Sequence, residues 1–96
     1  MNAKELIEQN KGTIVDVRTI GEFQGGHAAG SKNIPLNEVP VRIEEFRSME
    51  GPIILCCASG NRSGQATSFL SAQGIDCVNA GSWLDVNFYQ ANCVSN

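Results

Sequence analysis

The sequence is poor in positive charge and contains no long apolar run. Seven Lys and Arg residues stand against ten Asp and Glu residues, which gives a formal net charge of −3 at pH 7. Because there is no basic cluster, the chain has no electrostatic footprint for a nucleic acid or an anionic membrane, and we expect neither as a partner. No apolar stretch approaches the roughly 20 residues of a membrane span. Lys4, Glu5 and Glu8 fall where a signal peptide needs an apolar core, so we expect a cytoplasmic protein.

Histidine is nearly absent, and the cysteines are few. His27 is the single histidine, and no second ligand lies at a workable spacing from it, so we expect no metal site and assign His27 a structural role. Four cysteines allow two disulfides in principle, but Cys56 and Cys57 are neighbours and the spacing fits no small disulfide scaffold. Reduced thiols are therefore predicted, with Cys77 packed in a strand and Cys93 near the end of the chain.

The length and composition fit one small globular domain. The chain has 96 residues, 42% of them hydrophobic, so residues 1–96 are expected to form a single domain. Strand and helix patterns alternate along it, which predicts an α/β fold with a small parallel β-sheet and helices on both faces. The expected strands span residues 13–17, 33–36, 52–56 and 75–79. The expected helices span residues 2–10, 22–24, 40–48 and 63–73, and a last helix starts near Trp83.

The most informative stretch runs from Pro52 to Gly74. Its first five residues are an apolar run that predicts a short buried strand, and a loop follows. The loop consists of Cys57, Ala58, Ser59, Gly60, Asn61, Arg62 and Ser63. Small residues with Gly60 at the bend let the backbone N–H groups turn inward around a point near the Cys57 sulfur. Ser63 is expected to cap the helix that follows, so the sequence predicts an anion cradle at the end of a strand.

The charges around Cys57 favour its ionised form. Arg62 is the only charged side chain between Glu50 and Asp76, so we expect a positive field from this side chain and from the helix dipole. A free thiol with a pKa of about 8.5 is only a few per cent thiolate at neutral pH, and helix N-termini and nearby cations lower that pKa by roughly one to several units. Cys57 is therefore predicted to be a nucleophilic thiolate. The alternative, a small buried hydrophobic side chain, leaves the glycine bend, the arginine and the serine unexplained.

The pattern Cys57-x-x-Gly60-x-Arg62-Ser63 resembles the active-site loop of the rhodanese family, the persulfide-forming sulfurtransferases. Further motifs of that family lie upstream in the expected order, so the resemblance spans nearly the whole chain. These motifs are Asp16-Val17-Arg18, Glu22-Phe23, Gly26-His27, Gly30 and Asn33-Ile34-Pro35. The resemblance implies a rhodanese-like fold.

Asp16 and Arg18 are expected to support the loop. If the strands are parallel, the strand over residues 13–17 delivers both side chains to the same sheet edge as Cys57. From the residues alone, Asp16 fits a turn acceptor and Arg18 fits a surface ion pair with Glu22. The family resemblance also implies that these positions brace the loop and the segment after the first strand.

The leading prediction is a sulfurtransferase. The Cys57 thiolate would take the outer sulfur of thiosulfate or a similar anionic donor as a persulfide. It would then pass this sulfur to cyanide or to a thiol, and a protein thiol is one such acceptor. The N–H groups from Ala58 to Ser63 would stabilise the negative sulfur atoms, with Arg62 adding positive field or bracing the loop. No cofactor is required.

Two other functions fit the same residues. Counted from Cys56, the spacing to Arg62 is that of cysteine phosphatases, which opens phosphoryl or arsenate chemistry, whereas counted from Cys57 it is one residue shorter. A larger loop is needed to surround a tetrahedral oxyanion, and Cys56 is expected to be the last strand residue and to point into the sheet, so sulfur chemistry is favoured. A persulfide carrier or a binding module for a partner protein is the third reading, and a carrier uses the same residues.

Overall fold

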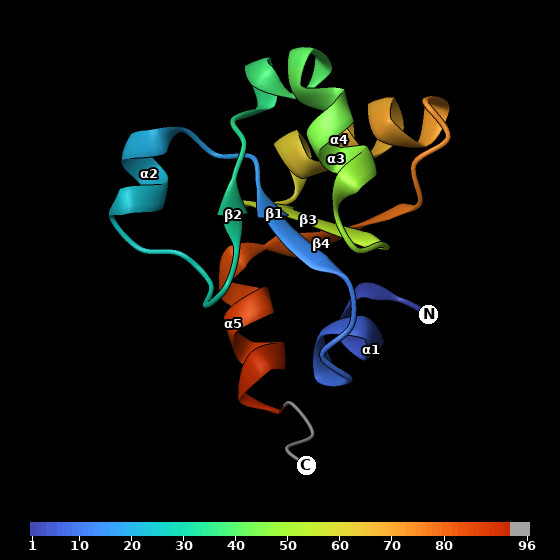
Figure 1. Cartoon of the computed structure of the whole chain (residues 1–96). Coiled ribbons are helices and arrows are strands. Elements are labelled where there is room, and N and C mark those ends of the chain that lie inside the picture. The colour runs from blue at the N-terminus through green and yellow to red at the C-terminus, as the bar shows by residue number, and fades with distance from the viewer. Residues whose placement is uncertain (93–96) are drawn as a thin grey trace.

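The computed structural model describes residues 1–92, and residues 93–96, including Cys93, lie outside the described part. A sheet of four parallel strands, in the order β2-β1-β3-β4, forms the centre of this part (Figure 1). The strands are β1 (Thr13–Asp16), β2 (Lys32–Asn33), β3 (Ile53–Cys57) and β4 (Cys77–Ser82). The helices are α1 (Ala3–Glu8), α2 (Ile20–Gln24), α3 (Ile43–Ser48), α4 (Asn61–Ala72) and α5 (Trp83–Ala91). The predicted α/β fold is confirmed.

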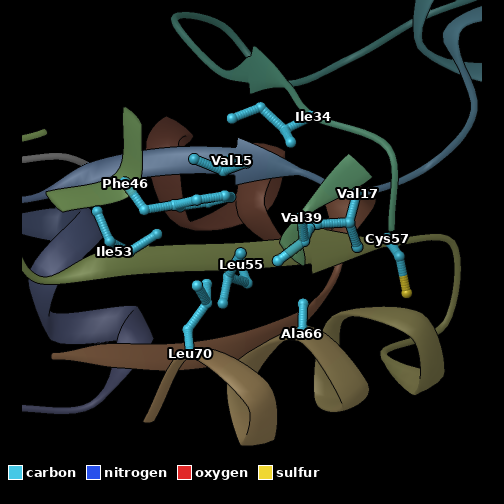
Figure 2. Close-up of a cluster of buried hydrophobic side chains, with 10 residues drawn as sticks. All are labelled: Val15, Val17, Ile34, Val39, Phe46, Ile53, Leu55, Cys57, Ala66 and Leu70. Carbon is cyan, nitrogen blue, oxygen red and sulfur yellow. The ribbon is translucent and has the colours of Figure 1, made fainter. Parts of the chain in front are cut away.

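Helices pack on both faces of the sheet, as the alternating pattern predicts. Successive residues of a strand point to opposite faces, so β3 contributes Leu55 to one buried cluster and Ile54 to the other. We call the first the α3/α4 cluster (Figure 2); its buried members are Val15, Val17, Ile34, Val39, Phe46, Ile53, Leu55, Cys57, Ala66 and Leu70. The second is the α1/α5 cluster, whose buried members are Ala3, Leu6, Ile7, Ala28, Ile54, Cys56, Ala80 and Val86.

The two neighbouring cysteines therefore lie on opposite faces of β3. Cys57 belongs to the α3/α4 cluster and Cys56 to the α1/α5 cluster. The expectation that Cys56 is the last strand residue is wrong, because Cys57 still pairs with Ser82 of β4. The expectation that Cys56 points into the sheet layers holds, since this residue has no exposed surface.

Two strands differ in extent from the sequence expectation. The edge strand β2 ends at Asn33, and after Pro35, which has no N–H to donate to a ladder, the chain enters short 3₁₀ turns at Leu36–Glu38 and Pro40–Arg42. Strand β4 starts at Cys77, later than expected, and continues to Ser82. Its register with β3 shifts between Leu55, which pairs with Asn79, and Cys56, which pairs with Gly81, and the pairing then continues to Ser82. This extension brings β4 beside the Cys57 loop.

Local signals place the first helix as predicted. Asn2 accepts a hydrogen bond from the Glu5 N–H at 2.8 Å, and the Glu5 carboxylate accepts one from the Asn2 N–H, which is a capping box. Leu6 and Ile7 are buried against the sheet. Among the described residues, no helix is long and apolar enough to span a membrane.

Candidate active site

Cys57 ends the central strand, and its sulfur points toward the loop that leads into α4 (Figure 2). The chain turns at Gly60, whose φ of +100° lies in the region that favours glycine. This turn brings the Gly60 N–H to 3.0 Å from the Cys57 Sγ, and the Ser63 Oγ lies 3.4 Å from the same sulfur. A backbone donor and a hydroxyl thus converge on the thiol, in the arrangement of an anion cradle.

Ser63 is not the helix cap that the sequence suggests. Helix α4 begins at Asn61, and Gly60 is its N-cap without a side-chain hydrogen bond. Ser63 therefore lies within the first turn, where it is completely buried. Its hydroxyl donates to the Asn79 Oδ1 at 2.7 Å, which ties the first turn of α4 to strand β4. Ser63 lies beside Cys57 as expected, but its hydroxyl bonds Asn79 and does not cap the helix.

The hydrogen bonds around the sulfur make Cys57 acidic. Burial by itself raises the pKa of this thiol, but the Ser63 hydroxyl and the N–H groups of Ser63, Ser59 and Gly60 outweigh it. The pKa of Cys57 is lowered to about 7 as a result. The thiolate is therefore more populated at neutral pH than in a free cysteine, which is only a few per cent ionised.

Cys56 has the opposite environment. Burial raises the pKa of its thiol to about 12, and the negative charge of Asp16 acts in the same direction. A thiol with this pKa is protonated at neutral pH and is a weak nucleophile. Of the two neighbouring cysteines, only Cys57 is therefore prepared for nucleophilic chemistry.

Arg62 is paired with a carboxylate, so it supplies less positive field than its isolation in the sequence suggests. Its guanidinium donates to both carboxylate oxygens of Glu22, at 2.7 and 3.0 Å. Both side chains are about one third exposed, and this bond holds the pKa of Glu22 low, at about 2. The pair links α2 to the start of α4.

Asp16 and Arg18 reach the same sheet edge as Cys57 but form a separate, buried ion pair. The Arg18 Nη2 lies 2.8 Å from the Asp16 Oδ2, and neither residue is more than 4% exposed. Asp16 also accepts from the Arg18 N–H at 3.0 Å, so the turn-acceptor interpretation is confirmed. The predicted surface ion pair between Arg18 and Glu22 is wrong, because Arg18 instead donates to the backbone carbonyls of Glu22 and Gly26.

The Asp16–Arg18 pair contacts α2 and the segment after it. The Arg18 guanidinium lies 4.7 Å from the ring centre of Trp83, and its carbonyl contacts hold α2 and the segment after it. Because α2 carries Glu22, this support continues through the ion pair to Arg62. These contacts connect the buried pair to the segment after the first strand and, through Glu22, to Arg62 at the start of α4.

Comparison with known proteins places this arrangement in a family. Residues 2–87 match the rhodanese-like domain family. The chain belongs to this family. The match includes Cys57, the loop that follows it and all of the upstream motifs.

Relatives of this rhodanese-like domain include a named enzyme. The chain is 41% identical over 64 residues to the uncharacterized protein YqhL of Bacillus subtilis, which is 67% of this chain and 50% of YqhL. It is 38% identical over 74 residues to the thiosulfate sulfurtransferase PspE of Escherichia coli, which is 75% of this chain and 71% of PspE. A rhodanese-related protein of Thermoplasma volcanium has the same fold, with a TM-score of 0.77, 31% identity, and coverage of 99% and 95% of the two chains.

The remaining predicted loop residues form the accessible rim of the rhodanese-like site. Ala58, Ser59 and Asn61 are exposed, whereas Cys57 is only 1% exposed. The described residues contain no group of three or more His, Cys, Asp or Glu side chains that could hold a metal ion. His27 stacks on Phe23, with 3.8 Å between the ring centres, and its Nδ1 lies 2.8 Å from the Phe23 carbonyl oxygen. These contacts fit the structural role predicted for it.

Two residues of the site escaped the sequence analysis. The sequence analysis pairs Glu22 with Arg18, whereas in the structure it pairs with Arg62. Asn79 was not considered at all, although it contacts Ser63 and the Gly60 carbonyl. The sequence gives little signal for Asn79, because it is the last residue of the strand expected over residues 75–79 and Asp76 of the same strand is also polar.

Proposed function

We propose that this rhodanese-like domain is a sulfurtransferase that carries sulfane sulfur on Cys57. The observation that supports this function best is the convergence of the Gly60 N–H and the Ser63 hydroxyl on a sulfur atom whose pKa is lowered to about 7. These donors stabilise negative charge without supplying a proton-transfer group, which suits a thiolate and its persulfide. The relative named thiosulfate sulfurtransferase supports the same class of reaction.

The proposed cycle has two displacements. The Cys57 thiolate attacks the outer sulfur of thiosulfate or a similar donor; an S–S bond to Cys57 forms, the S–S bond of the donor breaks, and sulfite leaves with the electron pair. Cyanide or a thiolate then attacks the outer sulfur of the persulfide, and the Cys57 thiolate is released. In the persulfide form the N–H groups from Ala58 to Ser63 face the outer sulfur and stabilise its charge. No oxidant, reductant or cofactor enters the cycle.

Supporting residues fix the cradle without contacting the sulfur atoms. Arg62, held by Glu22, braces the beginning of α4. Asp16 and Arg18 hold α2 and the segment after it. We assign these residues positioning roles because their charges are already paired within the protein.

Two observations favour sulfur over phosphoryl or arsenate chemistry. The longer spacing to Arg62 starts at Cys56, and that thiol is buried on the opposite face of β3 with a pKa raised to about 12. In a phosphatase-type site the arginine at this position would bind the oxyanion, but Arg62 is paired with Glu22. Both features leave the shorter loop from Cys57 as the better anion cradle.

Steady-state turnover tests the proposal. Wild-type protein, Cys57→Ser and Cys56→Ser are incubated with thiosulfate and cyanide, and thiocyanate is measured. We expect many turnovers for wild type and Cys56→Ser and none for Cys57→Ser, because a serine hydroxyl is hardly ionised at neutral pH. A single turnover from preloaded wild type, without repeated turnover, would identify a persulfide carrier. Cysteine-dependent hydrolysis of p-nitrophenyl phosphate without thiocyanate formation would refute sulfur transfer.

A further inference from the structure

Asn79 of β4 makes three hydrogen bonds to the residues around the Cys57 loop. Its Nδ2 donates to the Gly60 carbonyl at 3.0 Å. Its Oδ1 accepts from the Gly81 N–H at 3.0 Å and from the Ser63 hydroxyl at 2.7 Å. One exposed side chain therefore connects the loop, the first turn of α4 and the end of β4.

These partners fix the orientation of the Asn79 amide. A backbone carbonyl only accepts and a backbone N–H only donates, so the amide nitrogen must face Gly60 and the amide oxygen must face Gly81. The Ser63 hydroxyl then faces an oxygen atom that carries no hydrogen. The hydrogen between Ser63 and Asn79 must come from the serine.

Ser63 has one hydroxyl hydrogen and two atoms that compete for it. The Asn79 Oδ1 lies 2.7 Å from the Ser63 Oγ, and the Cys57 Sγ lies 3.4 Å from the same oxygen. One hydrogen cannot serve both atoms at full strength. A neutral sulfur is a weak acceptor, whereas a thiolate is a strong one, so the charge on the sulfur decides which atom receives the hydrogen.

We propose that Asn79 is a positioning residue that holds the Ser63 hydroxyl hydrogen and releases it to the Cys57 Sγ when that sulfur becomes negatively charged. The role rests on the proposed use of Cys57 as the nucleophile. In the thiolate the charge is on Sγ, and the hydrogen turns to it. In the persulfide the charge is on the outer sulfur, and the hydrogen returns to the Asn79 Oδ1. Ser63 thus follows the charge through both displacements without losing a partner.

Other charged and titratable groups near the site keep their partners when Asn79 is changed. These groups are Arg62 with Glu22, Asp16 with Arg18, Cys56 on the opposite face of β3, and Asp85 of α5. The Asp85 Oδ2 lies 3.7 Å from the position that a Cβ on Gly81 would occupy. None of these side chains forms a hydrogen bond or an ion pair with the Asn79 side chain. A substitution at Asn79 therefore removes hydrogen-bond partners only from Ser63, Gly60 and Gly81.

Two substitutions at Asn79 separate hydrogen placement from support of the loop. Asn79→Ala and Asn79→Asp both remove the hydrogen bond to the Gly60 carbonyl. The alanine variant frees the Ser63 hydrogen, so the pKa of Cys57 should fall by about 0.5 unit. The aspartate variant holds that hydrogen more strongly and adds negative charge, so the pKa should rise. A residue that only supported the loop would shift the pKa upward in both variants.

The pKa is measured from the pH dependence of iodoacetamide alkylation of Cys57, with the modified residue located by mass spectrometry. In a Ser63→Ala background, Asn79→Ala should leave the alkylation pKa unchanged, because the hydrogen that it would free is gone. Circular dichroism checks the fold of each variant. A pKa that rises or stays constant in Asn79→Ala, or that falls equally in the Ser63→Ala background, overturns the role of Asn79. This assay needs no sulfur donor, so its outcome is independent of sulfur transfer.

Discussion

Replacing Gly60 by alanine should weaken both the fold and the reactivity of Cys57. The φ of +100° at Gly60 disfavours any residue with a Cβ, at a cost of about 1–2 kcal/mol. The added Cβ would also lie 3.2 Å from the Gly81 Cα, a backbone atom that cannot rotate away, and we assign about 1 kcal/mol to this contact. The expected loss in the free energy of unfolding is thus about 2–3 kcal/mol. Movement of the Gly60 N–H away from the sulfur should raise the pKa of Cys57 as well.

Two other glycines give matched controls for this substitution. Gly74 has a φ of +80° and open space around it, so Gly74→Ala pays the conformational cost alone and leaves Cys57 unchanged. Gly21 has open space and lies in α2, where alanine is favoured by roughly 0.5–1 kcal/mol. Urea unfolding gives the stabilities, and pH-dependent alkylation gives the pKa. If Gly60→Ala costs no more than Gly74→Ala and leaves the alkylation pKa unchanged, the close approach of Gly60 and Gly81 does not hold the cradle.

Three further predictions follow from the charges of the site. Thiocyanate formation at a fixed concentration of donor should rise with pH through about 7 and then level off, because the pKa of Cys57 is lowered to that value and only the thiolate attacks. Arg62→Ala should reduce sulfur transfer, and between pH 4.5 and about 2 wild type should lose more stability than Arg62→Ala or Glu22→Gln, because the pKa of Glu22, lowered chiefly by Arg62, contributes stability above that window that is lost as pH falls through it. Asp16→Ala should cost about 3–5 kcal/mol in urea unfolding, since it leaves the buried Arg18 unpaired.

The order of the elements could be predicted because their signals are local. The apolar run into Cys57, the capping pair of Asn2 and Glu5, and the glycine after α4 each depend on neighbours within a few residues. The hydrogen bonds that the loop and Ser63 make to the Cys57 sulfur were also predictable, because these residues are close to Cys57 in the sequence. The ends of the strands were less predictable, because the pairing of Cys57 with Ser82 follows a register shift between β3 and β4.

The partners of the site residues were less predictable because they are distant in sequence. Glu22 and Arg62 are 40 residues apart, and nothing local indicates that Glu22 pairs with Arg62 rather than Arg18. The Ser63 hydroxyl bonds Asn79, 16 residues further on, so its apparent capping position gave the wrong partner. In each case the fold decides among several chemically suitable partners, and the sequence pattern carries no information about that choice.

The most direct measurement of the central claim is the mass of the protein after incubation with thiosulfate. The account predicts a gain of one sulfur atom per chain in wild type and in Cys56→Ser, loss of that gain in Cys57→Ser, and its removal by cyanide. The two serine variants are needed because the neighbouring cysteines fall in the same peptide. A sulfur atom retained in Cys57→Ser and lost in Cys56→Ser would contradict the assignment of the nucleophile and return the longer loop to consideration.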